Sequence, residues 1–241
     1  MKYVLLMIGT GMCILFACKK TNSFNARVLF YNASWSLPAV TASWNDGTAI
    51  SAALAQGGSS GTADSPYVAL PAGTNLVTIK SGTTELLNKN MYTAAAAGTS
   101  FIVFDTSTGA APARILQLSD DLTLPDTAQL KYRLLKLVPD VTLPVDTWLV
   151  NGVTDSIRLD SAGVFIGATT TADAAQSFNT VGFQGGNYTV KIKKTGTQQL
   201  YASLANYPFA VRGIYSIIFS GSPSGTGAAG LRVVVLRHPP Q

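Results

Sequence analysis

The sequence predicts an all-β protein built from antiparallel β-sandwiches, and three observations support this. Short runs of alternating apolar and polar residues, rich in β-branched and aromatic side chains, recur about every 8–14 residues. Gly, Pro, Asn and Asp separate these runs, and no stretch combines helical spacing with caps over more than two turns. Charged residues make up only 12% of the 241 residues, against an average of about 25%. Low charge with many small polar residues is typical of an exported β-rich protein.

The first 17 residues, "MKYVLLMIGTGMCILFA", have the layout of a secretory signal. Lys2 precedes an apolar stretch, and the small residue Ala17 stands where cleavage occurs. The stretch is shorter than the roughly 20 apolar residues that a spanning helix needs. Its length therefore disfavours the alternative of an uncleaved membrane anchor.

The run "LFAC" at the end of this stretch, residues 15–18, resembles a bacterial lipobox. Leu15 is at minus three, Ala17 at minus one, and Cys18 would be the new N-terminus. Cys13 fits less well, because a bulky residue precedes it. The resemblance implies that Cys18 carries lipid and that residues 18–25 form a tether. It also implies an exported protein that is lipid-anchored in the cell envelope, at the periplasmic or surface face of the outer membrane. No cysteine follows the anchor, so we expect no disulfide.

The predicted strands begin at Ala26, and turn residues bound them in order. Asp46-Gly47 and Asn151-Gly152 are hairpin signals, since Gly tolerates the positive φ of tight turns. Pro38 and Pro144 suit a strand start or edge. The most strand-like runs are "ARVLFYNA" (26–33), "NLVTIKSG" (75–82), "FIVFDTS" (101–107), "ARILQLS" (113–119), "NYTVKIKK" (187–194), "YSIIFSG" (215–221) and "LRVVVLR" (231–237).

An internal repeat divides the chain into two copies. "RVLFYNASWSLPAVTASWND" from Arg27 aligns with "RLLKLVPDVTLPVDTWLVNG" from Arg133 at an offset of 106, and later segments align at 113, 115 and 118. Each copy has about 100 residues, the size of one immunoglobulin-like sandwich. We therefore expect two tandem immunoglobulin-like domains, at residues 26–124 and 125–241. The polar segment 119–129 is expected to link them with few contacts across it.

The repeated motifs also resemble a known family. "RVLFYNASWSLPAV" and "LPAGTNLVTIK" in the first copy, with "LPVDTWLVNG" and "GGNYTVKIK" in the second, are similar to the domain-of-unknown-function 4397 family. The resemblance covers nearly all of residues 26–238. Pro139 and Asp140 depart from it, where the first copy has Ala33 and Ser34. The family implies single or tandem Ig-like repeats in bacterial exported and surface proteins, with no reaction or ligand.

Catalytic and metal chemistry has little support in the composition. The one histidine, His238, precedes two prolines at the chain end, where we expect it to be solvated. Without another histidine or a free cysteine, we expect no Ser-His-Asp or Cys-His nucleophile and no His/Cys zinc site. Calcium ligation has weak support, because the Asp residues lack the dense spacing of a dedicated loop; the candidates are Asp140, Asp146, Asp155 and Asp160. We therefore predict a non-enzyme without metal or cofactor.

Carboxylate catalysis stays open as the alternative, in the form of a hydrolase of surface glycans. Such an enzyme needs two carboxyl groups about 5–9 Å apart in a cleft. Asp120 and Asp121 are the obvious pair in this sequence. Adjacent residues near a strand end point to opposite sides, so we expect both to lie in a solvated turn.

Two surfaces are candidates for binding. Trp35, in the loop "NASWSLP", forms with Tyr31 or Trp44 a candidate sugar-stacking platform; packing of the loop on the first sandwich is the alternative. Trp44 and Trp148 lie within strands and are expected in the core. No acidic residue follows Asp173, which leaves a candidate basic patch: Lys191, Lys193, Lys194 and Arg212.

The basic patch suits lipid headgroups or an anionic glycan, and an ordinary solvated sheet face is its alternative. Nucleic acid is not expected, since an exported chain has little use for it and aromatic–basic interleaving is sparse. The function predicted from the sequence is a non-catalytic binding or structural module. Its expected partners are the membrane, through the lipid, and an envelope glycan or protein. A purely architectural domain leaning on the membrane is a further alternative.

Overall fold

The structure is a computed structural model, and it describes residues 25–45, 47–62, 65–105, 113–139, 144–152, 155–163 and 177–240. The predicted signal peptide, Cys18 and nearly all of the tether lie outside these residues. Within them, no helix is long and apolar enough to cross a membrane.

The regular secondary structure of the described residues is almost entirely β-strand, as the sequence predicts. The first half contains β1 (Asn25–Asn32), β2 (Ala39–Trp44), β3 (Thr48–Ala49), β4 (Leu54–Ala55), β5 (Val68–Pro71), β6 (Gly73–Ser81), β7 (Thr84–Thr93), β8 (Gly98–Phe104) and β9 (Arg114–Asp120). The second half contains β10 (Gln129–Lys136), β11 (Val145–Asn151), β12 (Asp155–Gly163), β13 (Asn179–Gly182), β14 (Gly186–Lys194), β15 (Leu200–Phe209), β16 (Ile214–Ser220) and β17 (Arg232–His238), with a 3-10 turn at Gly227–Ala229.

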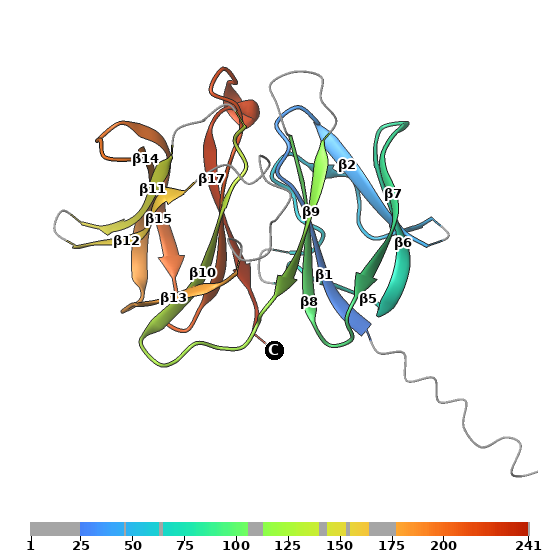
Figure 1. Cartoon of the computed structure of the whole chain (residues 1–241), viewed down its shortest axis with the longest axis horizontal. Helices are drawn as coiled ribbons and strands as arrows, with labels where there is room; N and C mark the ends of the chain where they lie inside the picture. Colours follow the sequence, from blue (N-terminus) through green and yellow to red (C-terminus); the bar gives the residue numbers. More distant parts are fainter. Residues whose placement is uncertain are drawn as a thin grey trace, which may run out of the picture.

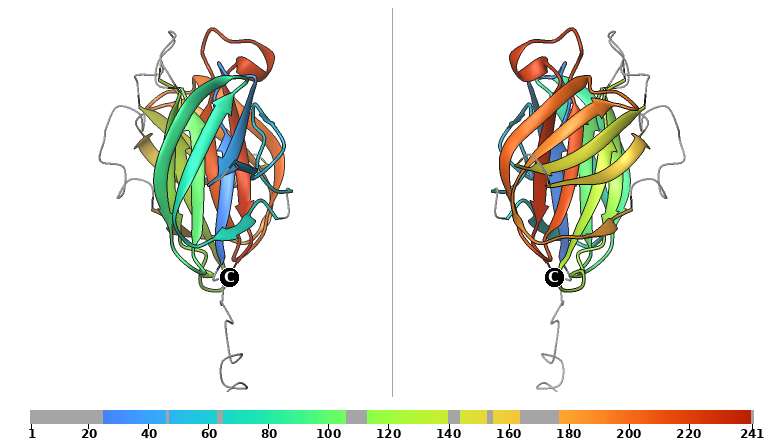
Figure 2. Two further views of the ribbon diagram at one scale, coloured as in Figure 1. Left: turned by 90° about the vertical axis from the view of Figure 1, so that its right-hand side faces the viewer. Right: turned by 90° about the vertical axis from the view of Figure 1, so that its left-hand side faces the viewer.

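These strands form four sheets, stacked as two sandwiches that face each other (Figure 1). The outer sheet of the first sandwich has the order β3-β2-β6-β7, with β4 also on β2, and its inner sheet has the order β5-β1-β8-β9. The second sandwich repeats this with β12-β11-β14-β15 outside and β13-β10-β16-β17 inside. Figure 2 shows the two outer sheets from opposite sides of the molecule.

The inner sheets are mixed, which corrects the expectation of purely antiparallel sandwiches. β1 runs parallel to β8, with Arg27 opposite Gly98, and β10 runs parallel to β16, with Lys131 opposite Ile214. The first strand of each copy therefore lies inside its sheet, between two strands that are distant in sequence. An alternating pattern predicts a strand but not which neighbour it pairs with.

The backbone hydrogen bonds also correct the alignment of the two copies. The N–H of Arg27 donates to Ala97 O, and the N–H of Lys131 donates to Gly213 O, each at 3.0 Å. Lys131 is thus the counterpart of Arg27, at an offset of 104 rather than 106. Arg133 then corresponds to Leu29, an apolar position. The match of two arginines in the sequence was misleading because side-chain identity does not report ladder register.

Three large apolar clusters and one small one fill the layers, and one of the large clusters lies between the inner sheets. The first and second clusters fill the two sandwiches. The third joins Tyr31 and Ile102 of one copy to Leu135 and Ile218 of the other. β8 and β16 are buried at all seven positions, as strands covered on both faces must be. Burying each large apolar side chain contributes about 1.5–3 kcal/mol, so the two sandwiches form one packed unit.

Candidate functional site

A sealed polar cluster interrupts the apolar layer between the inner sheets. Its members have polar side chains, exposed fractions of at most 9% and positions at one end of that layer: Tyr67, Ser100 and Asp120 from the first copy, and Arg133, Ser216 and His238 from the second. We call this set the inter-sheet network.

The two copies contribute equivalent positions to the inter-sheet network. Asp120 lies opposite Gly98 at the end of the β8–β9 hairpin, and His238 lies opposite Ile214 at the same place in the β16–β17 hairpin. Each of these two side chains also contacts a serine at an equivalent position of its copy. Ser100 Oγ donates to Asp120 Oδ2 at 2.7 Å, and Ser216 Oγ lies 2.7 Å from His238 Nε2.

Arg133 joins these two halves with all of its donor groups. Its NH1 forms an ion pair with Asp120 Oδ1 at 2.7 Å. Its NH2 donates to Ser100 Oγ at 3.1 Å and its Nε donates to Ser216 Oγ at 2.6 Å. The fixed fork of the guanidinium suits this three-way contact, which a lysine does not reproduce.

Tyr67 closes the ring of contacts, and its geometry assigns the histidine tautomer. The Tyr67 hydroxyl donates its single proton to Asp120 Oδ2 at 2.7 Å, so its oxygen must accept from His238 Nδ1 at 2.6 Å. His238 therefore carries a proton at Nδ1. Its Nε2 then accepts from Ser216, whose oxygen already receives the Arg133 Nε–H. Every polar atom of the inter-sheet network is paired.

Burial controls the electrostatics of His238 and Tyr67. Burial, reinforced by the Arg133 charge and opposed by Asp120, lowers the pKa of His238 to about 3. Burial and the Asp120 carboxylate raise the pKa of Tyr67 well above its usual range. The Phe178 ring covers the cluster, with the Arg133 guanidinium 4.6 Å from its centroid and His238 edge-on at 5.5 Å. His238 therefore stays uncharged at any physiological pH.

The structure corrects two expectations at this cluster. His238 is 1% exposed rather than solvated, because it is the last residue of β17 and the Arg27 guanidinium holds the following segment by bonds to Pro239 O and Pro240 O. Asp120 is the last residue of β9 and faces Arg133. Only Asp121 lies at the surface, where hydrogen bonds from Lys131 and Thr123 lower its pKa to about 2.

The inter-sheet network links serine, histidine, tyrosine and aspartate, but these side chains are closed off from solvent. Ser216 and Arg133 are 0% exposed, whereas a nucleophile has to meet its substrate. What the arrangement does is join the two sheets through a buried ion pair and its hydrogen bonds. Its sequence signal was a charged or hydroxyl residue inside an otherwise apolar strand, as in "RLLKL" and "YSIIFS".

The expected sugar platform does not form. Tyr31 lies between the inner sheets at 0% exposure, where burial raises its pKa to about 12. Trp44 is in the first core at 3% exposure. Trp35 is half-buried in its loop, and the Asp105 carboxylate holds that loop through Ser34 Oγ and the N–H of Trp35. The alternative of loop packing is what the structure has.

The candidate basic patch divides into two places. Lys191 and Lys193 are outward-facing residues of β14 on the outer sheet. Arg212 lies beyond Phe209, which pairs with Gly186 at the opposite end of β14. Seven residues of strand separate Gly186 from Lys193, about 23 Å at 3.3 Å per residue. Arg212 instead donates through Nε to Pro125 O at 3.1 Å, beside the connection between the copies.

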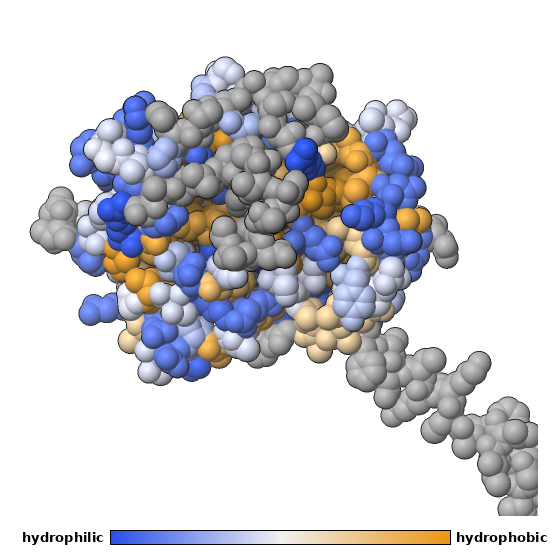
Figure 3. Space-filling model, in the orientation of Figure 1, coloured by the Kyte–Doolittle hydropathy of each residue, from blue (hydrophilic) through white to orange (hydrophobic). Residues whose placement is uncertain are grey.

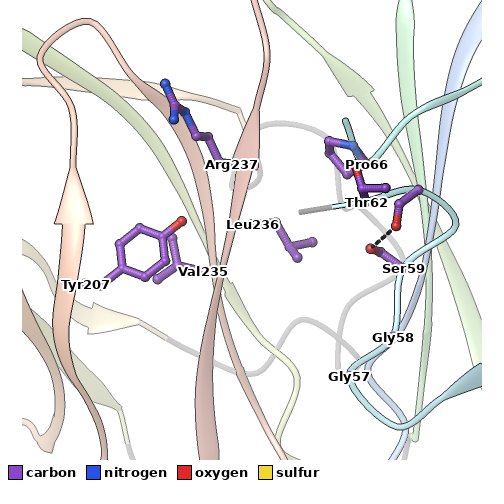
Figure 4. A pocket seen from close by; sticks show the side chains of 10 residues that line it. Gly57, Gly58, Ser59, Thr62, Pro66, Tyr207, Val235, Leu236 and Arg237 are labelled. Atoms are coloured by element: carbon purple, nitrogen blue, oxygen red, sulfur yellow. Dashed lines mark hydrogen bonds between the residues drawn. The ribbon is translucent and has the colours of Figure 1, made fainter. Parts of the chain in front are cut away.

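The described residues line at least two surface hollows. The first, about 390 Å³, lies between the sandwiches, with Gly57 and Ser59 of the first copy facing Tyr207 and Leu236 of the second (Figure 4). Burial raises the pKa of Tyr207 to about 12. In Figure 3, polar and apolar residues are interspersed over the coloured parts of both sandwiches.

The second hollow, about 410 Å³, lies on the outer sheet of the second sandwich beside Trp148 and Lys193. Trp148 is half-buried on that outer face, which corrects its expected place in the core. The strand pairing shows the reason. Trp44 lies opposite Val77, and Val190 is the residue of the second copy that corresponds to Val77. Leu149, not Trp148, lies opposite Val190, so Trp148 is one residue out of register with Trp44. A shift of one residue moves a side chain to the other face of a sheet.

Among the described residues, no group of three or more His, Cys, Asp or Glu side chains is placed to hold a metal ion. Asp146 accepts hydrogen bonds from Arg158 and Thr195, and Asp155 accepts one from Tyr188. Asp140 lies outside the described residues.

Comparison with known proteins adds little to this geometry. No protein-family model matches the sequence, and no curated protein matches it either. Among solved structures, the chain is similar to a leucine-rich repeat protein from Bacteroides thetaiotaomicron, with 12% sequence identity and a TM-score of 0.21. The match covers 83% of this chain and 26% of that one, so this chain spans about a quarter of its length. A likeness this distant says nothing about function.

Proposed function

We propose that the chain is a lipid-anchored protein of the bacterial cell envelope whose two repeats, of the domain-of-unknown-function 4397 type, act together as one non-catalytic binding module. The inter-sheet network is the observation that carries the proposal. It uses the single histidine, Asp120 and Arg133 to join the sandwiches, so they serve cohesion rather than catalysis. A rigid scaffold of this kind leaves its outer sheets and loops available for a partner.

The competing function, a carboxylate hydrolase, loses its best pair in this geometry. Asp120 is fully buried against Arg133, while the Asp121 side chain is 61% exposed and pairs with Lys131 at 2.7 Å. The two carboxylates face different surroundings, as adjacent strand residues do. A dyad needs both groups on one substrate, so this pair favours the binding module.

Lipid anchoring is tested by expressing the full-length chain in a bacterium fed an alkyne-labelled fatty acid. Labelling and membrane recovery should be lost in Cys18→Ser and kept in Cys13→Ser, the matched control. Labelling of Cys18→Ser would refute anchoring at that cysteine.

Binding is tested by screening the full-length protein in detergent against glycans and envelope proteins. Binding without turnover of the bound compound supports the module. Release of product from a bound glycan would replace it with the hydrolase.

A further inference from the structure

Trp148 lies in the middle of β11, which is an inner strand of the outer sheet of the second sandwich. This sheet faces the viewer in the right panel of Figure 2. Across the ladder Trp148 pairs with Arg158 on β12 and with Lys191 on β14. Its neighbour Leu149 points the other way, into the core. An indole on an exposed sheet face with a cation on each neighbouring strand is an unusual arrangement, because large aromatic side chains are normally buried.

Two cations lie close to this indole ring. The Arg158 guanidinium lies 5.7 Å and the Lys193 ammonium 6.0 Å from the Trp148 ring centroid, near the outer limit of a cation–π contact. Arg158 also reaches Asp146 at 3.3 Å, with 44% of its own side chain exposed. The Asp146 side chain is only 8% exposed, but the Arg158 side chain and the Lys193–Gln198 hydrogen bond lie at the surface, so both cations are within reach of a ligand.

A tight turn forms the wall of the hollow. Gly196 has a φ of +73°, which favours glycine, and the turn carries Thr197 and Gln198 past the end of β14. Gln198 Oε1 accepts from Lys193 Nζ at 2.7 Å. The hollow, about 410 Å³, thus combines an aromatic side, two cations and polar groups from one turn. Its volume lies in the range of roughly 300–1,000 Å³ for small-ligand sites.

We propose that this hollow binds an acidic saccharide, one pyranose ring of which stacks on Trp148 while its carboxylate pairs with Arg158 and Lys193. The inference rests on the proposed binding-module function and names the class of ligand. A flat aromatic face matches the apolar face of a sugar ring, and Arg and Lys form charge-assisted hydrogen bonds with carboxylates. The amide of Gln198 and the hydroxyl of Thr197 suit the ring hydroxyls.

A membrane surface fits this place less well. The cations surround a hollow instead of covering a flat face, and Arg212 lies at the far end of β14. One acidic group, Asp146, also lines the hollow, and it would oppose a phospholipid layer more than a single oriented sugar.

The first sandwich supplies an internal comparison, because it lacks the site at equivalent positions. Ser43 lies where the second copy has Trp148, paired with Ala49 and Thr78 in place of Arg158 and Lys191. Lys80 corresponds to Lys193. The site therefore belongs to the second copy alone, and residues of the first copy provide matched controls.

The test is calorimetric titration of the full-length protein in detergent with a tetragalacturonate, with its methyl ester and with phosphatidylglycerol vesicles. We expect the acid to bind at least about ten-fold more tightly than the ester. Trp148→Ser, which installs the residue of the first copy, should weaken binding of the acid at least about ten-fold. Lys193→Gln should weaken it about three-fold or more, while Lys80→Gln leaves it unchanged.

Equal binding by Trp148→Ser and the original protein would overturn the proposal, as would equal affinity for acid and ester or binding to vesicles alone. Lys193→Gln keeps the test valid should Trp148→Ser fail to fold. A neutral glycan or an envelope protein bound elsewhere would overturn the acidic-saccharide site and leave the binding module standing. No binding to any glycan or envelope protein would overturn both.

Discussion

Between about pH 7 and pH 5, acid should destabilise this protein mainly through one group, because His238 is its single histidine. Burial and Arg133 lower the pKa of His238 to about 3, from its ordinary value of 6.5. Between these two pH values the unfolded chain binds a proton that the folded chain does not, so the free energy of unfolding falls as the pH falls. The stability is complete above about pH 6.5 and its loss ends near pH 3.

The size of the loss follows from the same two values. Each pKa unit corresponds to about 1.36 kcal/mol, so the whole difference amounts to about 5 kcal/mol. About 2 kcal/mol of this is lost by about pH 5, before most carboxylates titrate. That is a large part of the 5–15 kcal/mol by which folded domains are usually stable.

The measurement is urea unfolding of the purified full-length protein at several pH values between about 7.5 and 5. His238→Gln is the control, because its amide does not titrate; its stability should be lower throughout and nearly flat over this range. Proton NMR of the single imidazole provides a direct check, since the folded protein should show no titration above about pH 4.

Two results would refute the reasoning. A folded-state pKa of His238 near 6.5 would mean that the inter-sheet network is open to water. An equal slope of stability against pH in the original protein and in His238→Gln would assign the pH dependence to other groups.

Three further predictions concern stability, each measured by urea unfolding. Arg133→Met should lower the free energy of unfolding by about 3–5 kcal/mol, because it leaves the Asp120 carboxylate buried without its cation. Adding Asp120→Leu should recover part of that loss. An unchanged urea midpoint in Arg133→Met would contradict the burial of the pair. Trp44→Ala should cost about 3–5 kcal/mol and Trp148→Ala less than about 1 kcal/mol, since only Trp44 fills a core; similar costs would contradict the opposite facing of the two rings. Asp105→Ala should cost about 2–3 kcal/mol and expose residues 33–37 to proteolysis, because it removes the acceptor of that loop's hydrogen bonds; unchanged cleavage would show that other contacts hold the loop.

Much of the architecture was predictable from local pattern. Alternation of apolar and polar residues is a property of each segment, so runs such as "NYTVKIKK" indicate a strand wherever they stand. Glycine at Asn151-Gly152 signals its turn because the left-handed conformation excludes most side chains. The repeat was also visible in the sequence, because equivalent strands need similar patterns.

The candidate site was only partly predictable. Lys191 and Lys193 were visible as outward-facing cations of one strand, since alternation determines their side of the sheet. Arg158 was not associated with them, because strand pairing brings it beside Trp148 from a distant segment. Trp148 itself was assigned to the wrong face, since a side chain's face depends on register to the single residue.

The sequence by itself determined an all-β chain in two similar copies, because strand periodicity and turn chemistry are local. Tertiary structure alone decided that the copies pack inner sheet to inner sheet. This packing buries His238 and Asp120, which the sequence placed at the chain end and in a linker, beside Arg133. The physical reason is that burial and hydrogen bonding of a polar side chain depend on what covers it. That cover comes from residues far away in the sequence, such as Tyr67 and His238, which are 171 positions apart.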